Sequence, residues 1–306
     1  MWYQPLIKYQ GDKGMSMYQP FVIVVRAAIP LLILLSVLVG SAARATVPEQ
    51  GDASTALITG SNRGIGLEFV RQYAEAGWQV IATCRSPERA DELQQLARSN
   101  RAISIEQLDI TDPGEIDRLQ QKLRGKPLHL LINNAALLGP RDQQSFAQLD
   151  YELAQTQFDV NALGPLRVAA AFLPNLLSGG PGKIVTLGSA AGSHGYLRPP
   201  ADFYSYRASK AALHFLMHNL ALELAGQGVV VGLLNPGLVD TRGLADIGPD
   251  DPVPDDFKQV VELIRTGRIE LIPPSESVAA MIEVIEKLGP EESGLFLNYD
   301  GQPVPW

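Results

Sequence analysis

The chain has 306 residues, of which 46% are hydrophobic and 19% charged, and its formal net charge at pH 7 is −8. This composition is that of a globular protein, since a disordered chain is more polar and more strongly charged. The acidic balance leaves no basic surface for a phosphate backbone, so nucleic acid is not an expected partner. Cys84 is the single cysteine, and therefore no intrachain disulfide can form.

An apolar run at residues 21–40 precedes the pattern of a folded domain. Residues 27–40 have the length of the apolar part of a secretory signal, and Ala43-Arg44-Ala45 offers the A-x-A pattern of a cleavage site. The run is also long enough to span a bilayer. Three interpretations of the leader at residues 1–50 stay open: a cleaved signal, a retained membrane anchor, or extra residues from an upstream start codon. Membrane contact is expected only through residues 21–40.

From residue 53 onward, short runs rich in Val, Ile and Leu alternate with amphipathic segments. The runs predicted as strands are residues 55–59, 78–84, 102–110, 128–135, 183–189, 229–237 and 294–299. The segments predicted as helices are residues 64–76, 87–98, 112–123, 149–177, 203–224 and 275–288. This alternation is typical of a parallel sheet covered by helices on both faces. We therefore predict that residues 53–306 form a single domain with a doubly wound α/β fold, the Rossmann fold, and that residues 248–257 form a surface loop.

A glycine-rich turn directly follows the first predicted strand. Its residues are Gly60, Ser61, Asn62, Arg63, Gly64, Ile65 and Gly66. Glycines let the backbone approach a pyrophosphate closely, and the N-terminus of the following helix stabilises its charge. Glycines in a turn can also be purely conformational, but the position of this turn between a strand and a helix favours cofactor binding.

The end of the second predicted strand, at residues 83–86, has no acidic residue that could bond the ribose 2′-hydroxyl of NAD. Arg85 is instead placed to pair with a 2′-phosphate, and Arg63 could serve the same group. The sequence therefore favours NADP(H) over NAD(H). The alternative is that either arginine is a solvated surface charge.

Polar residues also end the third and fourth predicted strands. Asp109 could accept a hydrogen bond from an adenine amino group. Asn133, Asn134 and Ala135 lie at the end of the fourth strand, where the asparagines could fix the strand ends and the ribose side of the ligand. Capping of the strand ends is the alternative, and it is sufficient to explain Asn133.

Tyr206 and Lys210 lie four residues apart on a predicted helix, which places the phenol and the ammonium on one face. A phenol is a poor base at neutral pH, but a neighbouring cation lowers its pKa. Lys210 would thereby make Tyr206 usable as a proton donor and acceptor. The pair is a weak signal by itself, and it gains weight from Ser189 at the end of the strand just upstream.

Together these motifs resemble the short-chain dehydrogenase/reductase family and, within it, the C-factor and sniffer-type carbonyl reductases. The resemblance covers essentially all of residues 53–306. It depends on the order of TGxxxGxG, NNAA, Asn161 in VNALGP, Ser189, YRASK and the NPGLVDT motif at residues 235–241. Two features depart from the family. NNAA replaces the usual NNAG, and Ser189 lies further upstream of Tyr206 than usual, which enlarges the loop around residues 194–202. Ser193 would restore the shorter spacing, but Ser189 is preferred because it ends the strand.

The resemblance implies that Tyr206 is the general acid of carbonyl reduction and that Ser189 orients the carbonyl. Lys210 would hold the ribose and lower the pKa of Tyr206, and Asn161 would position a water that returns protons to Lys210. Further residues implied to bind the cofactor, besides Tyr206 and Lys210 themselves, are Pro236, Gly237, Val239 and Thr241. The implied substrate is a small ketone or aldehyde, whose identity the sequence does not give beyond an apolar wall at residues 196–200.

A rival interpretation is a dinucleotide-binding signalling or regulatory protein on the same fold, without significant turnover. No metal is expected, because none of the four histidines, His129, His194, His214 and His218, has the partners of a metal site. Since NADPH is supplied inside cells, we expect the enzyme to face the cytosol, either free or tethered, with export as the open alternative. A homo-oligomer is compatible with the sequence.

Overall fold

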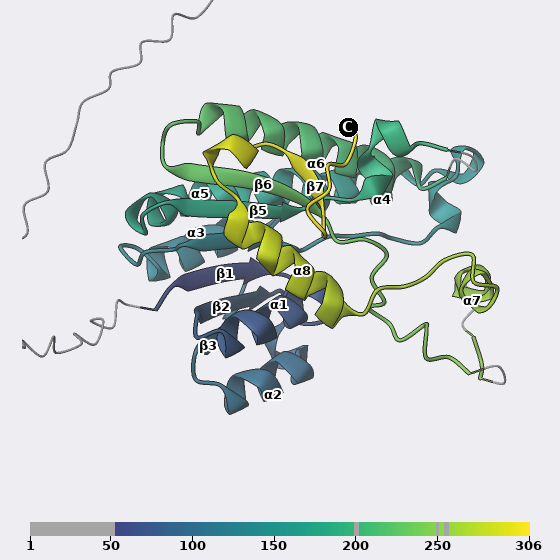
Figure 1. The fold of residues 1–306 in the computed structure, drawn as a ribbon, viewed down its shortest axis with the longest axis horizontal. Coiled ribbons are helices and arrows are strands. Elements are labelled where there is room, and N and C mark those ends of the chain that lie inside the picture. Colours follow the sequence, from purple (N-terminus) through teal and green to yellow (C-terminus); the bar gives the residue numbers. More distant parts are fainter. Residues whose placement is uncertain (1–52, 199–201, 249–250, 254–256) are drawn as a thin grey trace, which may run out of the picture. The chain divides into compact units, whose positions relative to one another are not determined.

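The computed structural model describes residues 53–198, 202–248, 251–253 and 257–306, and the predicted leader lies outside them. Within these residues one sheet of seven parallel strands has the order β3-β2-β1-β4-β5-β6-β7 (Figure 1). The strands are β1 (Thr55–Thr59), β2 (Gln79–Cys84), β3 (Ile103–Gln107), β4 (Leu130–Asn133), β5 (Gly182–Leu187), β6 (Val229–Asn235) and β7 (Phe296–Asn298). The strand order reverses between β1 and β4, which confirms the predicted doubly wound fold.

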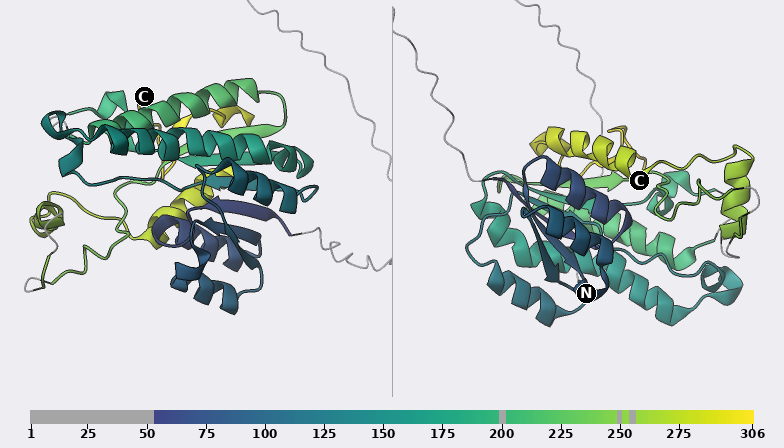
Figure 2. Two further views of the ribbon diagram at one scale, coloured as in Figure 1. Left: turned by 180° about the vertical axis from the view of Figure 1, so that it is seen from behind. Right: turned by 90° about the horizontal axis from the view of Figure 1, so that it is seen from below.

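Helices cover both faces of the sheet (Figure 2). The helices of the described residues are α1 (Gly64–Glu75), α2 (Asp91–Ser99), α3 (Pro113–Lys122), α4 (Tyr151–Phe158), α5 (Gly164–Ser178), α6 (Tyr204–Glu223), α7 (Lys258–Arg265) and α8 (Pro274–Lys287). Helix α7 lies apart from the sheet (Figure 1). Helices α3, α5 and α6 contribute to the apolar cluster on one face. Helices α1, α2 and α8 contribute to the cluster on the other. Because both faces are buried, the strands read as nearly continuous hydrophobic runs in the sequence.

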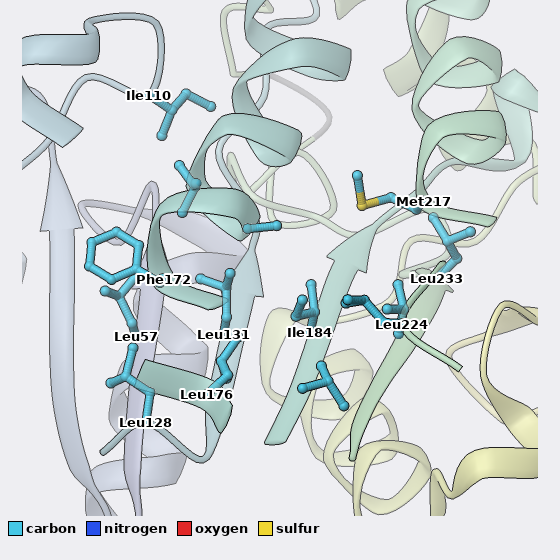
Figure 3. Close-up of a cluster of buried hydrophobic side chains, with 14 of the residues drawn as sticks. Leu57, Ile110, Leu128, Leu131, Phe172, Leu176, Ile184, Met217, Leu224 and Leu233 are labelled. Carbon is cyan, nitrogen blue, oxygen red and sulfur yellow. The ribbon is translucent and has the colours of Figure 1, made fainter. Parts of the chain in front are cut away.

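The core under α5 shows how strand register builds a packed layer. Leu57 lies beside Leu131 across β1 and β4, and Leu131 lies beside Ile184 across β4 and β5. These side chains share one face of the sheet, and Phe172 of α5 belongs to the same fully buried cluster (Figure 3). Burying each such side chain contributes about 1.5–3 kcal/mol. The next residue along a strand, such as Ile58, belongs to the cluster on the opposite face.

Two helices begin at aspartates that satisfy backbone N–H groups of the first turn. The carboxylate of Asp112 accepts from the N–H of Gly114 at 2.7 Å, and Pro113 occupies the first position of α3. The carboxylate of Asp150 accepts from the N–H groups of Glu152 and Leu153 at 2.9 and 3.0 Å, which fixes the start of α4.

The predicted helix over residues 149–177 is present as one helical stretch, Tyr151–Ser178, and a turn of π-helix lies in its middle. Helix α4 ends at Phe158, a turn of π-helix covers Asp159–Leu163, and α5 begins at Gly164. Pro165 explains the π-turn, because it has no N–H to donate to the carbonyl of Asn161 and its ring would collide with that carbonyl in a regular α-helix. Such π-turns are frequent at functional sites. Helix α7 was not predicted; it follows the expected surface loop at residues 248–257, which is only partly described.

The stretch Tyr151–Ser178, which joins α4 and α5, is the one stretch of the described residues that is long and apolar enough to cross a membrane. Half of its most apolar window is buried inside the fold. It therefore has the character of a core helix, as its contribution of Phe172 to the core indicates.

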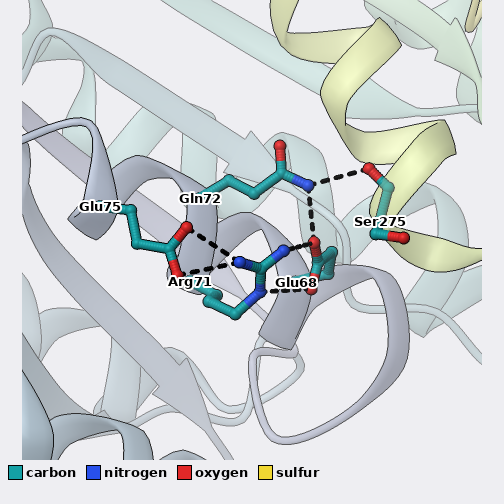
Figure 4. A network of polar contacts seen from close by, with 5 residues as sticks. All are labelled: Glu68, Arg71, Gln72, Glu75 and Ser275. Carbon is teal, nitrogen blue, oxygen red and sulfur yellow. Dashed lines mark hydrogen bonds and ion pairs between the residues drawn. The ribbon is translucent and has the colours of Figure 1, made fainter.

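A polar network fastens α8 to α1 (Figure 4). The side-chain amide of Gln72 donates to the carbonyl of Ser275 at 2.9 Å and to Glu68 at 2.6 Å. Arg71 pairs with Glu68 and, at 2.8 Å, with Glu75. Partly exposed ion pairs of this kind contribute at most about 1 kcal/mol each. The bond from Gln72 to Ser275 matters more for the architecture, because it joins segments distant in the chain.

Candidate active site

The glycine turn packs tightly against the end of β4. Gly60 and Gly64 have φ values of +67° and +56°, which side-chain-bearing residues rarely adopt. A Cβ on Gly60 would lie 2.8 Å from the Cα of Ala135, and one on Gly66 would lie 2.3 Å from the carbonyl oxygen of Gly60. Helix α1 begins at Gly64, so the N–H groups of its first turn are available to an anion.

Asn134 supports this turn from within the protein. Its side-chain amide donates to the carbonyls of Thr59 and Gly60 at 2.8 and 3.0 Å. The hydroxyl of Thr59 in turn accepts from the N–H groups of Asn134 and Ala135 at 3.0 and 3.1 Å. The neighbouring Asn133 is buried and donates to the carbonyl of Pro165 at 3.3 Å. Both asparagines thus fix strand ends, the alternative role that the sequence left open.

Some side chains of the glycine turn are buried in the protein and others are exposed to solvent. Ser61 is fully buried, its hydroxyl donates to the carbonyl of Ile58 at 2.8 Å, and its N–H donates to the carbonyl of Thr83 at 2.9 Å. Ile65 is half-buried against the core. Asn62 and Arg63 are exposed. A cofactor at this turn would therefore meet the side chains of Asn62 and Arg63, whereas the Ser61 side chain is enclosed in the protein.

A cavity of about 500 Å³ lies beyond the carboxyl ends of β2 and β3. Its lining residues are Arg85, Asp109, Thr111, Gln155, Thr156, Asp159 and Val160. One carboxylate oxygen of Asp109 accepts from the N–H and the hydroxyl of Thr111 at 2.9 and 2.7 Å. The structure thus brings Arg85 and Asp109, predicted to bind the two parts of an adenosine 2′-phosphate, to one cavity.

The loop after β6 returns to the glycine turn. A Cβ on Gly64 would lie 3.1 Å from the side chain of Thr241, so these two predicted cofactor segments are neighbours. Gly237 has a φ of +80°, and Val239 forms a bridge with Ile272. The carbonyl of Pro236 accepts from a serine hydroxyl of α8 at 2.7 Å. The predicted cofactor residues of this motif therefore lie at the same end of the sheet as the glycine turn.

Ser189 lies just beyond β5 and is fixed by its neighbours. Its N–H donates to Nε2 of His214 at 3.2 Å, and the following N–H, that of Ala190, donates to the side chain of Asn235 at 3.0 Å. The Ser189 side chain lies near enough to the phenol of Tyr206 to affect its pKa. The alternative Ser193 is buried, and its hydroxyl donates to the carbonyl of Pro305. This geometry favours Ser189 as the hydroxyl that faces the tyrosine.

Burial dominates the electrostatics of Tyr206 and Lys210. Burial raises the pKa of Tyr206, while the Ser189 side chain opposes that rise. We expected Lys210 to lower the pKa of the phenol, but the net direction is upward. Burial also lowers the pKa of Lys210 to about 8, and its Nζ donates to the carbonyl of Leu187 at 2.9 Å. Lys210 can therefore change its charge within reach of neutral pH.

His214 is a residue whose connection to the site the sequence did not predict. It is buried one helical turn after Lys210. Burial, with a further contribution from the charge of Lys210, lowers the pKa of His214 to about 3. The imidazole is thus neutral at physiological pH and can accept the Ser189 N–H. The only sequence signal was its spacing of four residues from Lys210. Among the described residues, no cluster of metal-ligand side chains forms.

Asn161 lies in the π-turn and is fully buried. Its side chain accepts from the N–H of Leu137 at 2.7 Å and donates to the carbonyl of Leu137 at 2.8 Å and to the hydroxyl of Ser209 at 2.9 Å. Ser209 donates to the carbonyl of Tyr206 at 2.8 Å. Asn161 is therefore linked to the tyrosine, but its carboxamide is bonded to protein groups rather than directed to a water beside Lys210.

The C-terminal residues border the loop that follows Ser189. The N–H of Gly195 donates to the carbonyl of Trp306 at 2.7 Å. The ring of Trp306 contacts His218, with 5.1 Å between centroids, and Phe296, with 5.8 Å. These contacts hold the first residues of the enlarged loop, around Gly195. Residues 199–201 of this loop lie outside the described residues.

The fold and site define an α/β protein with a dinucleotide-type turn and a linked serine, tyrosine and lysine. Residues 54–252 match the family model of short chain dehydrogenases. An uncharacterized oxidoreductase of Schizosaccharomyces pombe is 30% identical over 253 residues, which are 81% of this chain and 96% of that protein. The chain belongs to the short-chain dehydrogenase family, as its motifs predicted.

Two solved structures are similar in fold. The NADPH-bound carbonyl reductase from chicken fatty liver is 31% identical with a TM-score of 0.69, and the match covers 83% of this chain and 99% of that one. The carbonyl reductase Sniffer of Drosophila melanogaster is 26% identical with a TM-score of 0.68, covering 83% and 100%. The predicted likeness to sniffer-type carbonyl reductases is thereby confirmed.

Proposed function

We propose that this protein is an NADPH-dependent carbonyl reductase in which Tyr206 protonates the carbonyl oxygen of a small ketone or aldehyde. The observation that carries the proposal is a pair of hydrogen bonds that hold the end of β5, with Ser189, against the helix of Tyr206. The buried ammonium of Lys210 donates to the carbonyl of Leu187 at 2.9 Å, and the N–H of Ser189 donates to His214 at 3.2 Å. A protein that only senses a dinucleotide has no need for a proton donor paired with a second hydroxyl.

The residues present fit NADP(H). Gly60 and Gly66 have no room for a Cβ, so the backbone of the turn packs directly on the end of β4, and the start of α1 offers N–H groups to a pyrophosphate. Arg85 lies at the cavity, with Arg63 exposed in the turn, and both suit a 2′-phosphate. No acidic residue ends β2, where a free ribose hydroxyl would be bonded. We also propose that Tyr206 and Lys210 contact the ribose.

NADPH, when bound, supplies the hydride. Ser189 holds the carbonyl oxygen by a hydrogen bond, and Tyr206 transfers its phenolic proton to that oxygen as negative charge develops there. The raised pKa of Tyr206 keeps the phenol protonated and ready to donate. Lys210, with its pKa of about 8, stabilises the phenolate left behind and serves as the next proton source. A water that returns protons to Lys210 would be held by the backbone carbonyl of Asn161. In a regular α-helix this carbonyl would accept from the N–H of residue 165, but Pro165 has no N–H.

The substrate is proposed to carry an apolar group. Large hydrophobic side chains are exposed after the ends of three neighbouring strands, at Leu138 after β4, at Tyr196 and Leu197 after β5, and at Leu238 after β6. Ligand sites of doubly wound folds lie at this edge of the sheet. Apolar walls around one hydrogen-bonding pair favour aromatic or aliphatic carbonyl compounds over sugars.

We further propose that the enzyme works on the cytosolic side, where NADPH is supplied, either free or tethered by residues 21–40. This proposal is tested by fractionating cells and sequencing the mature N-terminus. A mature protein that begins at Thr46 outside the cytosol would establish export instead.

The function is tested by following NADPH absorbance while the protein is offered aromatic aldehydes, aliphatic aldehydes and diketones. We expect turnover with at least one class and an apolar preference within it. NADPH binding by fluorescence without consumption for any carbonyl would contradict the proposal and favour a regulatory protein.

A further inference from the structure

Gln144 is a fully buried polar residue in the loop between β4 and α4. It ends a short 3₁₀ turn, Asp142–Gln144, and has no exposed surface. Its side-chain amide donates to the carbonyls of Leu138 and Pro140 at 2.8 and 2.9 Å. Both donor hydrogens are thus used to hold the loop that follows the NNAA motif.

The carbonyl oxygen of the same carboxamide reaches the start of α6. It accepts from the backbone N–H of Tyr206 at 3.1 Å and from the hydroxyl of Ser205 at 3.2 Å. A second buried glutamine, Gln157 of α4, donates to this oxygen at 3.1 Å and to the carbonyl of Leu138 at 2.5 Å. Gln144 therefore links the loop, α4 and the backbone of the proposed proton donor.

Helix α6 needs such a partner because its own N-terminus has no side-chain cap. The residue before the helix is Phe203, which has a φ of +53° and makes no capping hydrogen bond. The first N–H groups of a helix otherwise stay unsatisfied, and Ser, Thr, Asp or Asn at the N-cap usually accepts from them. Here the acceptor comes from Gln144, 62 residues away in the chain, and the N–H it satisfies is that of Tyr206 itself.

We propose that Gln144 is a positioning residue for the reaction: it fixes the first turn of α6, and with it the Tyr206 phenol, relative to the loop at residues 137–140. The proposal rests on the proposed carbonyl reductase function. A glutamine that only stabilised the loop would need bonds to Leu138 and Pro140 alone. The bond to the tyrosine's own N–H predicts in addition that losing Gln144 impairs proton transfer more than cofactor binding.

The first test compares Gln144→Met with wild type. Methionine preserves the length of the side chain and removes its hydrogen bonds. We expect kcat to fall about tenfold or more while the dissociation constant of NADPH stays within about twofold. The matched control is Gln143→Met, because Gln143 is the exposed neighbour in the same turn. Unchanged kcat and KM in Gln144→Met would overturn the proposal, as would an equal loss in the Gln143 variant.

The second test uses Gln144→Glu, whose hydrogen bonds depend on its protonation. In its protonated form the introduced carboxyl group can donate to a loop carbonyl and accept from Tyr206, whereas the ionised form has no donor and faces two carbonyl oxygens. Burial raises the pKa of a carboxyl group at such a position. We therefore expect the ratio of variant to wild-type kcat to fall about tenfold as pH rises from the acidic into the neutral range. A flat ratio would overturn the proposal.

Charged groups on the surrounding elements are the same in wild type and in this variant. They include Arg141, Asp142, Asp150, Glu152, Asp202, Arg207 and Lys210. Gln143→Glu adds the same charge at an exposed position and serves as the control for the pH series.

A third measurement does not need activity. Hydrogen exchange of the Tyr206 amide should be slow in wild type and faster in Gln144→Met, with amides in the middle of α6 unchanged. Wild-type protein that reduces no carbonyl would refute the proposed function even if this protection difference were found. Active wild type with an unprotected Tyr206 amide would refute the role of Gln144 alone.

Discussion

The imidazole of His214 accepts a hydrogen bond from the backbone N–H of Ser189, with 3.2 Å between the two nitrogens. His214 belongs to the same helix as Tyr206 and Lys210, while Ser189 follows β5. The bond therefore joins the two elements that carry the proposed catalytic groups. It requires a neutral imidazole, because a protonated one has no lone pair to accept with.

This bond makes stability depend on pH. The pKa of His214 is lowered from its ordinary 6.5 to about 3, so its stabilising contribution is present above pH 6.5 and is lost as pH falls toward 3. We expect the unfolding free energy of wild type, relative to His214→Gln, to decrease by on the order of 2–3 kcal/mol between pH 7 and pH 4.5. Urea unfolding at the two pH values measures this. His194→Gln, which removes a histidine at an exposed position, is the control.

Replacing Tyr206 by Phe should separate proton transfer from binding. The variant keeps the ring and removes the donor, so we expect kcat to fall by about two orders of magnitude or more while NADPH binding is kept. Steady-state kinetics and NADPH fluorescence measure the two quantities. Tyr204→Phe is the control, since Tyr204 precedes Tyr206 by two residues and is exposed. Near-full turnover of Tyr206→Phe would remove Tyr206 from its proposed role.

Cofactor choice should depend on Arg85. Replacing it by Asp places an acceptor where a ribose hydroxyl can be bonded and repels a 2′-phosphate, so kcat/KM should shift from NADPH toward NADH. Arg101→Asp makes the same change in charge at an exposed position before β3 and should leave the preference unaltered. Equal use of both cofactors by the wild type would contradict the assignment.

Stability should depend on Phe172 far more than on Phe146. Phe172 is fully buried, so Phe172→Ala leaves a cavity and should cost about 3–5 kcal/mol in unfolding free energy. Phe146 is 84% exposed, and Phe146→Ala should change that free energy by less than about 0.5 kcal/mol. Chemical unfolding of both variants compares them directly. Similar costs would mean that the two rings share an environment.

Residues 1–50 should be dispensable for folding of the described domain. Strand β1 begins at Thr55 and pairs with β2 and β4 along its own length, so the sheet is complete without the apolar run. A chain that begins at Gly51 should be soluble and as active as the full chain, by circular dichroism and NADPH turnover. Precipitation or loss of NADPH binding would show that the leader packs on the domain.

The sequence predicted the strands well because each is buried on both faces, so that runs such as residues 229–235 are apolar throughout. It points to Ser189, Tyr206 and Lys210 as a candidate site, because Ser189 ends a predicted strand and the other two residues lie one helical turn apart. The helix over residues 149–177 was predicted from its apolar pattern, but that pattern does not reveal the π-turn that Pro165 causes.

Other features depend on contacts that no local pattern contains. Gln144 is one polar residue in a polar loop, and only the fold brings it to α6. Ser61 and Asn134 were expected at the cofactor, yet their side chains are bonded to the strands, because a tight turn has few other donors to satisfy its carbonyls. The bonds of Ser61 and Asn134 become visible only once the pairing of β1 with β2 and β4 is known.

The bond between Gln144 and Tyr206 also has a consequence for the order in which the molecule assembles. Helix formation is local and fast, whereas contacts between residues 62 apart form only after a long loop has closed. Because Phe203 does not cap α6, the first turn of that helix becomes fixed only when Gln144 of the loop after β4 has formed its hydrogen bond to Tyr206. A chain that has acquired its helices but not its tertiary contacts therefore has no competent proton donor, and recovery of activity during refolding will lag behind recovery of helical content.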